Sequence, residues 1–454
     1  MATEIKQQSR WTESSALETK KLALKEAVKR QVLADKRYFN KPGRTCDIEQ
    51  EVQALDSNTG RPIDVQDYFS TNSIGARPDT TVFNIEFDAN GITSLTADGI
   101  LSLYKSMTRR TQQIQAGLRG LKPDTIIVPI GLQPFSTSEE ARDLIVKDEI
   151  KRKRYDLMEK RTLEENPIKI IRVVNPKTGK ELIEPASNLT AMTRCSGTQI
   201  HISDCTIKDA LQTHNILIAV TPIMVALFGN SIFAGGMDTG RVNTRIELLR
   251  QAEQLRAGLP LPAFSLLEYY QNQLRNTLPP FIELHNPALA LDLAHSAIHT
   301  TSRIRVDIEN GTVRNEIRQI DSQSPFTTIQ ALVLTFGAIE GLRNHVLPSF
   351  EQSKTNFQKA VFGLYAPLQW GKRTTTIQDA AVSLIQLARE SLKKRGMKLL
   401  SKDFLDPLES DILIGISQGN SIRKIVRKLI KEGYSRQEAI IVVLNKLNRQ
   451  ALQA

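Results

Sequence analysis

The sequence predicts an α+β fold, in which a mainly antiparallel sheet is surrounded by helices. Several short segments alternate polar and apolar residues with period two, as half-buried strands do. Turn signals separate some of these segments by only a few residues, and long amphipathic or apolar stretches between them are typical of helices. At 454 residues the chain exceeds the usual single-core size of about 250–300 residues. We therefore expect an N-terminal helical extension (1–43), a main domain (44–400) and a small basic helical module (401–454).

Composition narrows the class of protein. A hydrophobic content of 40% and a charged content of 24% describe an ordinary globular protein. The net charge of +11 indicates an anionic partner without saying which one. Three cysteines (Cys46, Cys195, Cys205) in so long a chain argue against a disulfide framework and favour a reducing compartment, and no C-x-x-C pair occurs. No apolar leader is seen and the longest apolar run (216–228) is short for a bilayer, so we expect a cytoplasmic protein with no membrane partner.

The N-terminal half begins with an amphipathic helix over 12–37 and continues with an acidic strand over 46–56. On this strand Asp47, Glu49 and Glu51 share one face. Carboxylates this close repel one another unless a cation lies between them, and Mg²⁺ prefers oxygen ligands. A solvated edge strand is the alternative. The turn signal at 56–62 predicts a hairpin with the strand that follows.

A second strand over 80–88 carries Glu86 and Asp88 on one face. A helix over 92–118 with a cap at Thr93 or Ser94 follows, and 125–131 is a short buried strand. Residues 137–165 are predicted to form a charged helix whose basic run, 151–154, offers only weak support for a nucleic-acid surface.

The middle of the chain contains a strand over 196–202, a core helix over 207–228 and an unusual loop over 229–245. On the strand, Gln199 and His201 share a polar face, where His201 is either a structural residue or a contact to ligand or phosphate. The loop combines glycines with polar residues and arginines, a composition that suits anion binding, although a plain connection is the alternative.

The C-terminal half opens with a strand over 303–309 and a returning strand over 313–321, on which Arg314, Glu316 and Arg318 share a face. This row is either a surface ion-pair stripe or one more metal carboxylate flanked by guanidinium groups. Helices are expected from Thr327, over 375–400 and over 407–448. The sequence contains no P-loop, no Rossmann fingerprint, no H-E-x-x-H and no G-x-S-x-G.

Taken together, the segments resemble the carboxylate–amine ligase family that includes one class of bacterial and archaeal glutamate–cysteine ligases. The resemblance covers roughly residues 44–370 and rests on the order of its motifs rather than on any one of them. The motifs are Ile48-Glu49-Gln50-Glu51, Asn84-Ile85-Glu86, Gly131-Leu132-Gln133-Pro134-Phe135, Gly197 to His201, Ala226 to Ser231 with Asp238-Thr239-Gly240 and Arg245, and Arg305 with Glu316-Ile317-Arg318 and Asp321.

The resemblance implies a glutamine synthetase-like fold, in which a curved antiparallel sheet lines a catalytic funnel, and an ATP- and Mg²⁺-dependent ligase reaction. ATP would phosphorylate a carboxylate, classically that of glutamate, and an amine would displace phosphate to form an amide. The resemblance implies three groups of site residues: metal or phosphate ligands at Glu49, Glu51, Glu86, His201 and Glu316; catalytic arginines at Arg245, Arg305 and Arg318; and substrate-binding residues at Gln199, Asn230, Asp238, Thr239 and Gly240.

Two departures from the family pattern concern the substrate. Gln199 and Gln133 stand where the family has histidines, and glutamine is a neutral ligand and no general base. The implied partners are therefore small-molecule amino acid and amine substrates with the amine left open, in a chain compatible with a homo-oligomer. A nucleotide-binding homologue without turnover and a nucleic-acid-binding protein are the alternatives, the latter not favoured.

Overall fold

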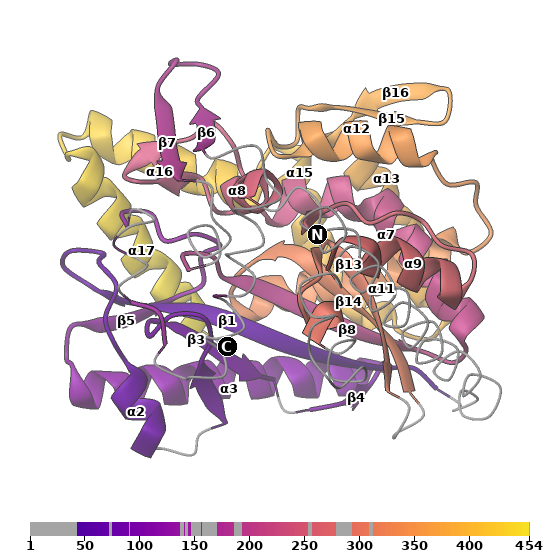
Figure 1. Ribbon diagram of the computed structural model, residues 1–454, viewed down its shortest axis with the longest axis horizontal. Coiled ribbons are helices and arrows are strands. Elements are labelled where there is room, and N and C mark those ends of the chain that lie inside the picture. The colour runs from indigo at the N-terminus through magenta and orange to yellow at the C-terminus, as the bar shows by residue number, and fades with distance from the viewer. Residues whose placement is uncertain are drawn as a thin grey trace, which may run out of the picture.

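The computed structural model (Figure 1) describes residues 43–453 with gaps at 72–74, 90, 137–139, 141–143, 147–155, 157–169, 186–192, 253–256, 278–292 and 308–311. The predicted helix over 12–37 and the basic run 151–154 lie outside the described residues, as does most of the predicted helix over 137–165.

An eight-stranded sheet forms the centre of the protein. Its strands follow the order β13 (Ser302–Asp307), β14 (Thr312–Asp321), β8 (Gly197–Asp204), β1 (Thr45–Asp56), β3 (Asn84–Asp88), β2 (Ala76–Pro78), and β4 (Thr93–Ser94) and β5 (Thr125–Val128) pair with the two ends of β1. Every paired strand of this sheet is antiparallel to its neighbour, which confirms the predicted α+β class with a mainly antiparallel sheet.

One face of the sheet is covered by helices α7 (Ile207–Phe228) and α11 (Pro325–Leu342), and α13 (Ile377–Lys394) packs against α11 in a second layer. Ile48, Ile200 and Ile317 project from three adjacent strands into one apolar cluster with these helices. Since strand side chains alternate, the residues between them face the other way, and there the polar side chains gather. Helices α7 and α11 are long and apolar enough to cross a membrane, but 89% and 83% of their apolar windows are buried inside the protein, as in core helices.

Smaller elements surround this core. The further helices are α2 (Gln66–Thr71), α3 (Ala97–Leu121), α8 (Thr244–Ala252), α9 (Leu266–Thr277), α12 (Phe350–Ala360) and α14 (Lys398–Leu400), with one π-helical turn at Ser401–Leu405. The small strand pairs are β6 (Ile170–Val174) with β7 (Glu181–Pro185), β9 (Phe233–Ala234) with β10 (Met237–Asp238), β11 (Ala257–Gly258) with β12 (His299–Thr300), and β15 (Pro367–Trp370) with β16 (Arg373–Thr376).

Helices α15 (Asp406–Leu413), α16 (Gln418–Lys431) and α17 (Arg436–Leu452) follow at the C-terminal end (Figure 1), where α17 packs against β5 of the sheet and α16 packs against α17. Leu55 of β1 shares an apolar cluster with Leu444 of α17. The side-chain amide of Asn445 donates a hydrogen bond to the carbonyl of Ser57 at 2.9 Å. The C-terminal helices therefore complete the core of the sheet at this end of β1.

Two local predictions need correction. The helix predicted over 92–118 begins later, with Thr96 as its N-cap, because Thr93 and Ser94 are drawn into the sheet as β4 opposite the start of β1. The turn after Asp56 does form a tight hairpin, in which the amide of Asp56 donates to the carbonyl of Arg61 at 2.8 Å and Leu55 bridges to Pro62, but the hairpin does not continue into the long partner strand. Helix α2 and strand β2 intervene, and β3 then returns beside β1.

Candidate active site

Three carboxylates form one wall of a cavity on the polar face of the sheet. Glu49 and Glu51 project from β1 and Glu86 from β3, with Glu51 directly opposite Glu86 and Glu49 directly opposite Asp88. Alternation along β1 buries Ile48, Gln50 and Val52 on the other side of the strand. Glu49, Glu51 and Glu86 line a cavity of about 380 Å³. The structure thus brings together the acids predicted on two separate strands.

Arginines form a second wall of this cavity. Arg245 from α8, Arg303 and Arg305 from β13 and Arg318 from β14 line the same cavity. Gln199 of β8 lies between the two walls. Its side-chain amide donates to Glu51 Oε1 at 3.5 Å, and its oxygen accepts a hydrogen bond from Arg318 at 2.8 Å. A neutral amide at this position can serve a carboxylate and a guanidinium at once, because it has both a donor and an acceptor.

The carboxylate wall is electrostatically strained. Burial raises the pKa of Glu49 to about 7, with a further contribution from Glu86. Burial also raises the pKa of Glu51 to about 8, together with the charges of Asp79 and Glu86. One backbone group stabilises the charged form of Glu51, since the amide of Gly197 donates to its Oε2 at 2.6 Å. A cation between these oxygens would relieve the repulsion and allow both groups to ionise near neutral pH.

Glu316 and His201 lie on the same face of the sheet as the cavity, but neither residue lines it. Glu316 is 1% exposed and is bound by Arg303 at 2.7 Å, with Arg305, Arg314 and Arg318 at 3.5, 3.7 and 3.5 Å. Burial alone raises the pKa of Glu316, but the surrounding guanidinium groups outweigh it and hold the pKa below its usual range. The carboxylate is therefore already matched to cations of the protein itself.

His201 stands opposite Glu316 in the ladder between β8 and β14. Its Nε2 lies 3.6 Å from Glu49 Oε1 and neither ring nitrogen has a hydrogen-bond partner. Burial lowers the pKa of His201 to about 3, so the ring is neutral at physiological pH. A neutral buried imidazole with free nitrogens beside Glu49 can orient that carboxylate or accept a ligand.

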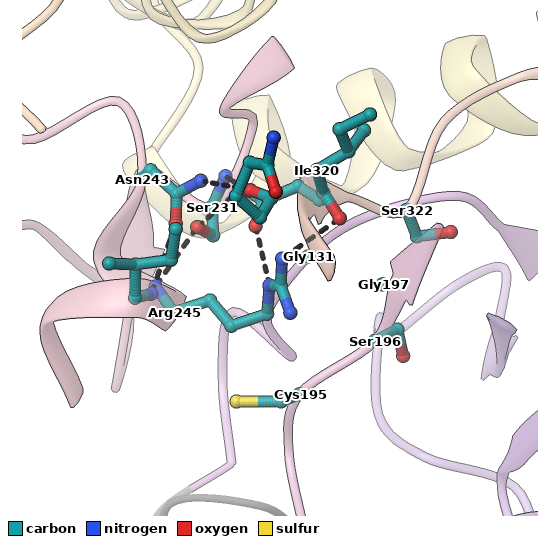
Figure 2. A network of polar contacts seen from close by, with 12 residues as sticks. Gly131, Cys195, Ser196, Gly197, Ser231, Asn243, Arg245, Ile320 and Ser322 are labelled. Atoms are coloured by element: carbon teal, nitrogen blue, oxygen red, sulfur yellow. Dashed lines mark hydrogen bonds and ion pairs between the residues drawn. The ribbon is translucent and has the colours of Figure 1, made fainter. Parts of the chain in front are cut away.

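Asp321 holds Arg245 in place through a network of polar contacts, in which Figure 2 labels Arg245, Ser231 and Ile320. Its Oδ2 accepts hydrogen bonds from the backbone amides of Asn230 and Ser231 at 2.8 and 2.9 Å and from the Ser231 hydroxyl at 2.7 Å. Its Oδ1 accepts from Arg245 Nε at 2.7 Å, while Arg245 Nη2 donates to the carbonyl of Ile320 at 2.8 Å. These contacts, which we call the Asp321 hub, fix Arg245 at the edge of the cavity.

The residues of the glycine-rich loop that were predicted to bind substrate lie away from the cavity of the carboxylate wall. Asn230 is buried, where its side chain accepts from the amide of Gly131 and donates to the carbonyls of Pro129 and Ser322. Thr239 is also buried and bonds within the loop. Asp238 and Gly240 line a second cavity beside α16. None of these four residues lines the cavity between the carboxylate and arginine side chains.

Some lining residues were missed by sequence reasoning. Arg303 could have been found, because it precedes Arg305 by two positions on a predicted strand and so shares its face. Arg77 and Asp79 reach the cavity from the edge next to β3, and Arg77 bonds Glu86 at 2.7 Å. No spacing in the sequence signals these two. Cys195 also lines the cavity, but burial raises the pKa of its thiol to about 12, which keeps it protonated.

Comparison with known families identifies the chain. The family model described as "Glutamate-cysteine ligase family 2" matches residues 47–346. The chain belongs to this family. As a member of glutamate-cysteine ligase family 2 it is a carbon–nitrogen ligase, and the matched segment contains both walls of the cavity.

Solved structures of ligases share the fold. A glutamate–cysteine ligase from Francisella tularensis, in complex with AMP, has a TM-score of 0.60 at 13% identity, over 92% of this chain and 90% of that one. A bifunctional glutathione synthetase from Pasteurella multocida has a TM-score of 0.55 at 10% identity, over 93% of this chain and 54% of that one. Comparison with curated protein sequences gives no match. The predicted membership of the glutamate–cysteine ligase family and its ligase fold are confirmed.

Proposed function

We propose that this family member is an ATP- and Mg²⁺-dependent carboxylate–amine ligase that forms an amide through an acyl phosphate. The observation that carries the proposal is one cavity lined by two groups of opposite charge: the carboxylates Glu49, Glu51 and Glu86, and the arginines Arg245, Arg305 and Arg318. A single cavity with both signs of charge suits a reaction whose reactants are anions and whose counter-ion is a cation.

The chemistry of the carboxylate wall fits Mg²⁺. Its donors are hard oxygens, and two of them have pKa values raised to about 7 and about 8 by burial and by neighbouring carboxylates. Among the described residues no group of three or more His, Cys, Asp or Glu side chains is close enough to hold a metal ion alone. Mg²⁺ would therefore be held by a few of these carboxylates together with phosphate oxygens of the nucleotide.

The side chains would divide the work as follows. Glu49, Glu51 and Glu86 would hold Mg²⁺, which supplies charge neutralisation for the phosphates when bound. Arg318 and Arg305 would hold the transferring phosphoryl group or the substrate carboxylate, because guanidinium forks match both anions.

Three further residues would act through these. Arg245 would define the edge of the phosphate site, fixed there by Asp321. Gln199 would hold Glu51 and Arg318 in register. His201 would keep Glu49 oriented from behind, and Glu316 would anchor the arginines rather than bind the metal directly.

The substrates would be glutamate or a similar amino acid and a small amine, with the acceptor amine unassigned. The test is a panel of amines incubated with glutamate and ATP, with ADP release measured with and without Mg²⁺. We expect Mg²⁺-dependent ADP release with at least one amine, and a loss of about 100-fold or more in the Glu51→Gln variant.

The matched control is Asp88→Asn. Asp88 stands opposite Glu49 on the same sheet but is exposed and does not line the cavity, so its variant should keep its activity. Binding of ATP with Mg²⁺ and no turnover with any acid and amine pair would refute the ligase and support a nucleotide-binding homologue without turnover. Unchanged activity in Glu51→Gln would refute the assigned site.

A further inference from the structure

A second cavity lies outside the proposed catalytic site, between the β6–β7 hairpin and the C-terminal helices. Figure 1 shows the hairpin and helix α16 side by side. Its volume is about 190 Å³. Phe233, Val426 and Ile430 supply apolar surface to it. None of its lining residues lines the larger cavity, so the two sites are separate.

Cations surround this apolar surface. Lys177 and Lys180 come from the turn of the hairpin, Arg423 and Arg427 from α16, and Arg436 from the first residue of α17. Among the described residues that line the cavity, Asp238 is the one carboxylate. It is already bound by Arg423, whose Nε lies 3.1 Å from Oδ2, and Arg427 stands 3.9 Å away. The remaining positive charge has no counterpart within the cavity.

The walls are held in place before any ligand arrives. The side-chain amide of Asn175 in the hairpin turn donates to the backbone carbonyl of Asp238 at 2.7 Å. Arg241 donates to the carbonyl of Val174 at 2.8 Å, and Arg423 donates to the carbonyl of Arg241 at 2.7 Å. Hairpin, loop and helix α16 are therefore joined by three direct contacts, and a ligand would not have to assemble the site.

We propose that this hairpin–α16 cavity binds a small phosphate monoester whose organic part is apolar or aromatic. Arginine and lysine side chains around a concave site match the charge and the oxygen geometry of a phosphate group. The apolar residues would take the organic part, which inorganic phosphate lacks. A cavity half the volume of the catalytic one favours a compact ligand.

A long polyanion would use a different surface. Lys424, Lys428 and Lys431 are exposed on α16 but do not line the cavity. A nucleic acid held by charge alone would cover these lysines together with the rim, since backbone contacts follow exposed cations rather than one pocket. The two kinds of ligand therefore leave different footprints on lysine residues.

The experiment uses the full chain and phenyl phosphate as the probe. Lysines are acetylated with an amine-reactive reagent, with and without probe, and the modification of each lysine is read by mass spectrometry. We expect phenyl phosphate to slow acetylation of Lys177 and Lys180 while Lys424 and Lys428 react as before. Protection should approach about tenfold at ten times the dissociation constant, if occupancy limits access. Inorganic phosphate should protect more weakly at equal concentration.

Matched charge variants decide the location. The double variant Arg427→Glu/Arg436→Glu changes the rim and should abolish protection of Lys177 and Lys180. The control Lys424→Glu/Lys428→Glu makes the same change of net charge on the same surface outside the cavity and should keep it. All four side chains belong to exposed residues, so both variants should fold, as circular dichroism would verify.

Three results would overturn the proposal: no protection of Lys177 and Lys180, equal loss of protection in both double variants, or protection of all the α16 lysines by a single-stranded oligonucleotide but of none by phenyl phosphate. None of these depends on turnover, so the outcome is independent of the ligase assignment.

Discussion

Replacing Asp321 by asparagine tests the hub that positions Arg245. The substitution keeps the shape of the side chain but removes its charge. Oδ2 receives three hydrogen bonds and Oδ1 receives one from Arg245, so both carboxylate oxygens face donors. An amide nitrogen placed at either position would point its own hydrogens at these donors. Arg245, which is only 7% exposed, would also lose the negative charge that balances its own.

The expected cost follows from that burial. Removing one partner of a buried ion pair typically destabilises a protein by about 3–5 kcal/mol, because the other charge is left without compensation. Asp406 is the matched control. It binds Arg389 at 2.8 Å, nearly the distance of 2.7 Å between Asp321 and Arg245, but the Asp406 side chain is 51% exposed. Exposed pairs contribute about 0–1 kcal/mol, so Asp406→Asn should be nearly neutral.

Urea denaturation followed by circular dichroism measures both changes in the free energy of unfolding. Asp321→Asn should lower it by several times the effect of Asp406→Asn, and it should also lower any ADP release by the folded protein, since Arg245 lines the cavity. A loss below about 1 kcal/mol in Asp321→Asn would refute the reasoning. It would mean that water or a shifted backbone replaces the hub.

Three further predictions concern protons and packing. The affinity for Mg²⁺ should rise with pH, because the Glu51 carboxyl, with its pKa raised to about 8, must lose a proton to bind the cation. Calorimetry in buffers of different ionisation enthalpy should detect the release of this proton, and no release would contradict the prediction. Gly131→Ala would place a Cβ 2.2 Å from Asp321 Cγ and should cost roughly 1–3 kcal/mol in urea denaturation, whereas Gly120→Ala, with no atom within 4 Å, should cost nothing. Burial lowers the pKa of His214 to about 4, so as pH falls below 6.5 the unfolded chain takes up this proton before the folded protein does. Between pH 7 and 5 the free energy of unfolding should therefore fall by roughly 2 kcal/mol more in the wild type than in His214→Gln. Equal pH dependence in the two proteins would contradict the lowered pKa of His214.

Much of the carboxylate wall could be predicted from the sequence. Period-two alternation alone places Glu49 and Glu51 on the face opposite Ile48 and Val52, as the structure confirms. Which residue of β3 lies opposite Glu51 could not be predicted in this way. That register depends on pairing across an intervening helix and strand, and here it brings Glu86 into place.

The roles of the arginine wall and of the glycine-rich loop could not be predicted from sequence patterns. Glu316 between two arginines fits a surface ion-pair stripe and a ligand equally well in the sequence. The structure shows a third arrangement, in which Glu316 is buried against Arg303 while Arg314 and Arg318 stay partly exposed. Asn230 in a glycine-rich loop has the chemistry of a ligand, but its side-chain amide bridges backbone groups of two other segments, at 129–131 and at Ser322. Polar side chains that satisfy buried backbone and those that await a substrate look the same in a sequence.

The partnership between β1 and α17 bears on how the chain acquires its shape during synthesis. Ser57 and Asn445, which bond at the end of β1, are 388 positions apart. A ribosome therefore exposes the central strand long before the helix that covers Leu55 exists. In the meantime that surface is open to wrong partners, and contacts so distant along the chain form slowly. Maturation of the enzyme should accordingly wait for its tail, and nascent chains halted before residue 436 should be held by chaperones rather than released.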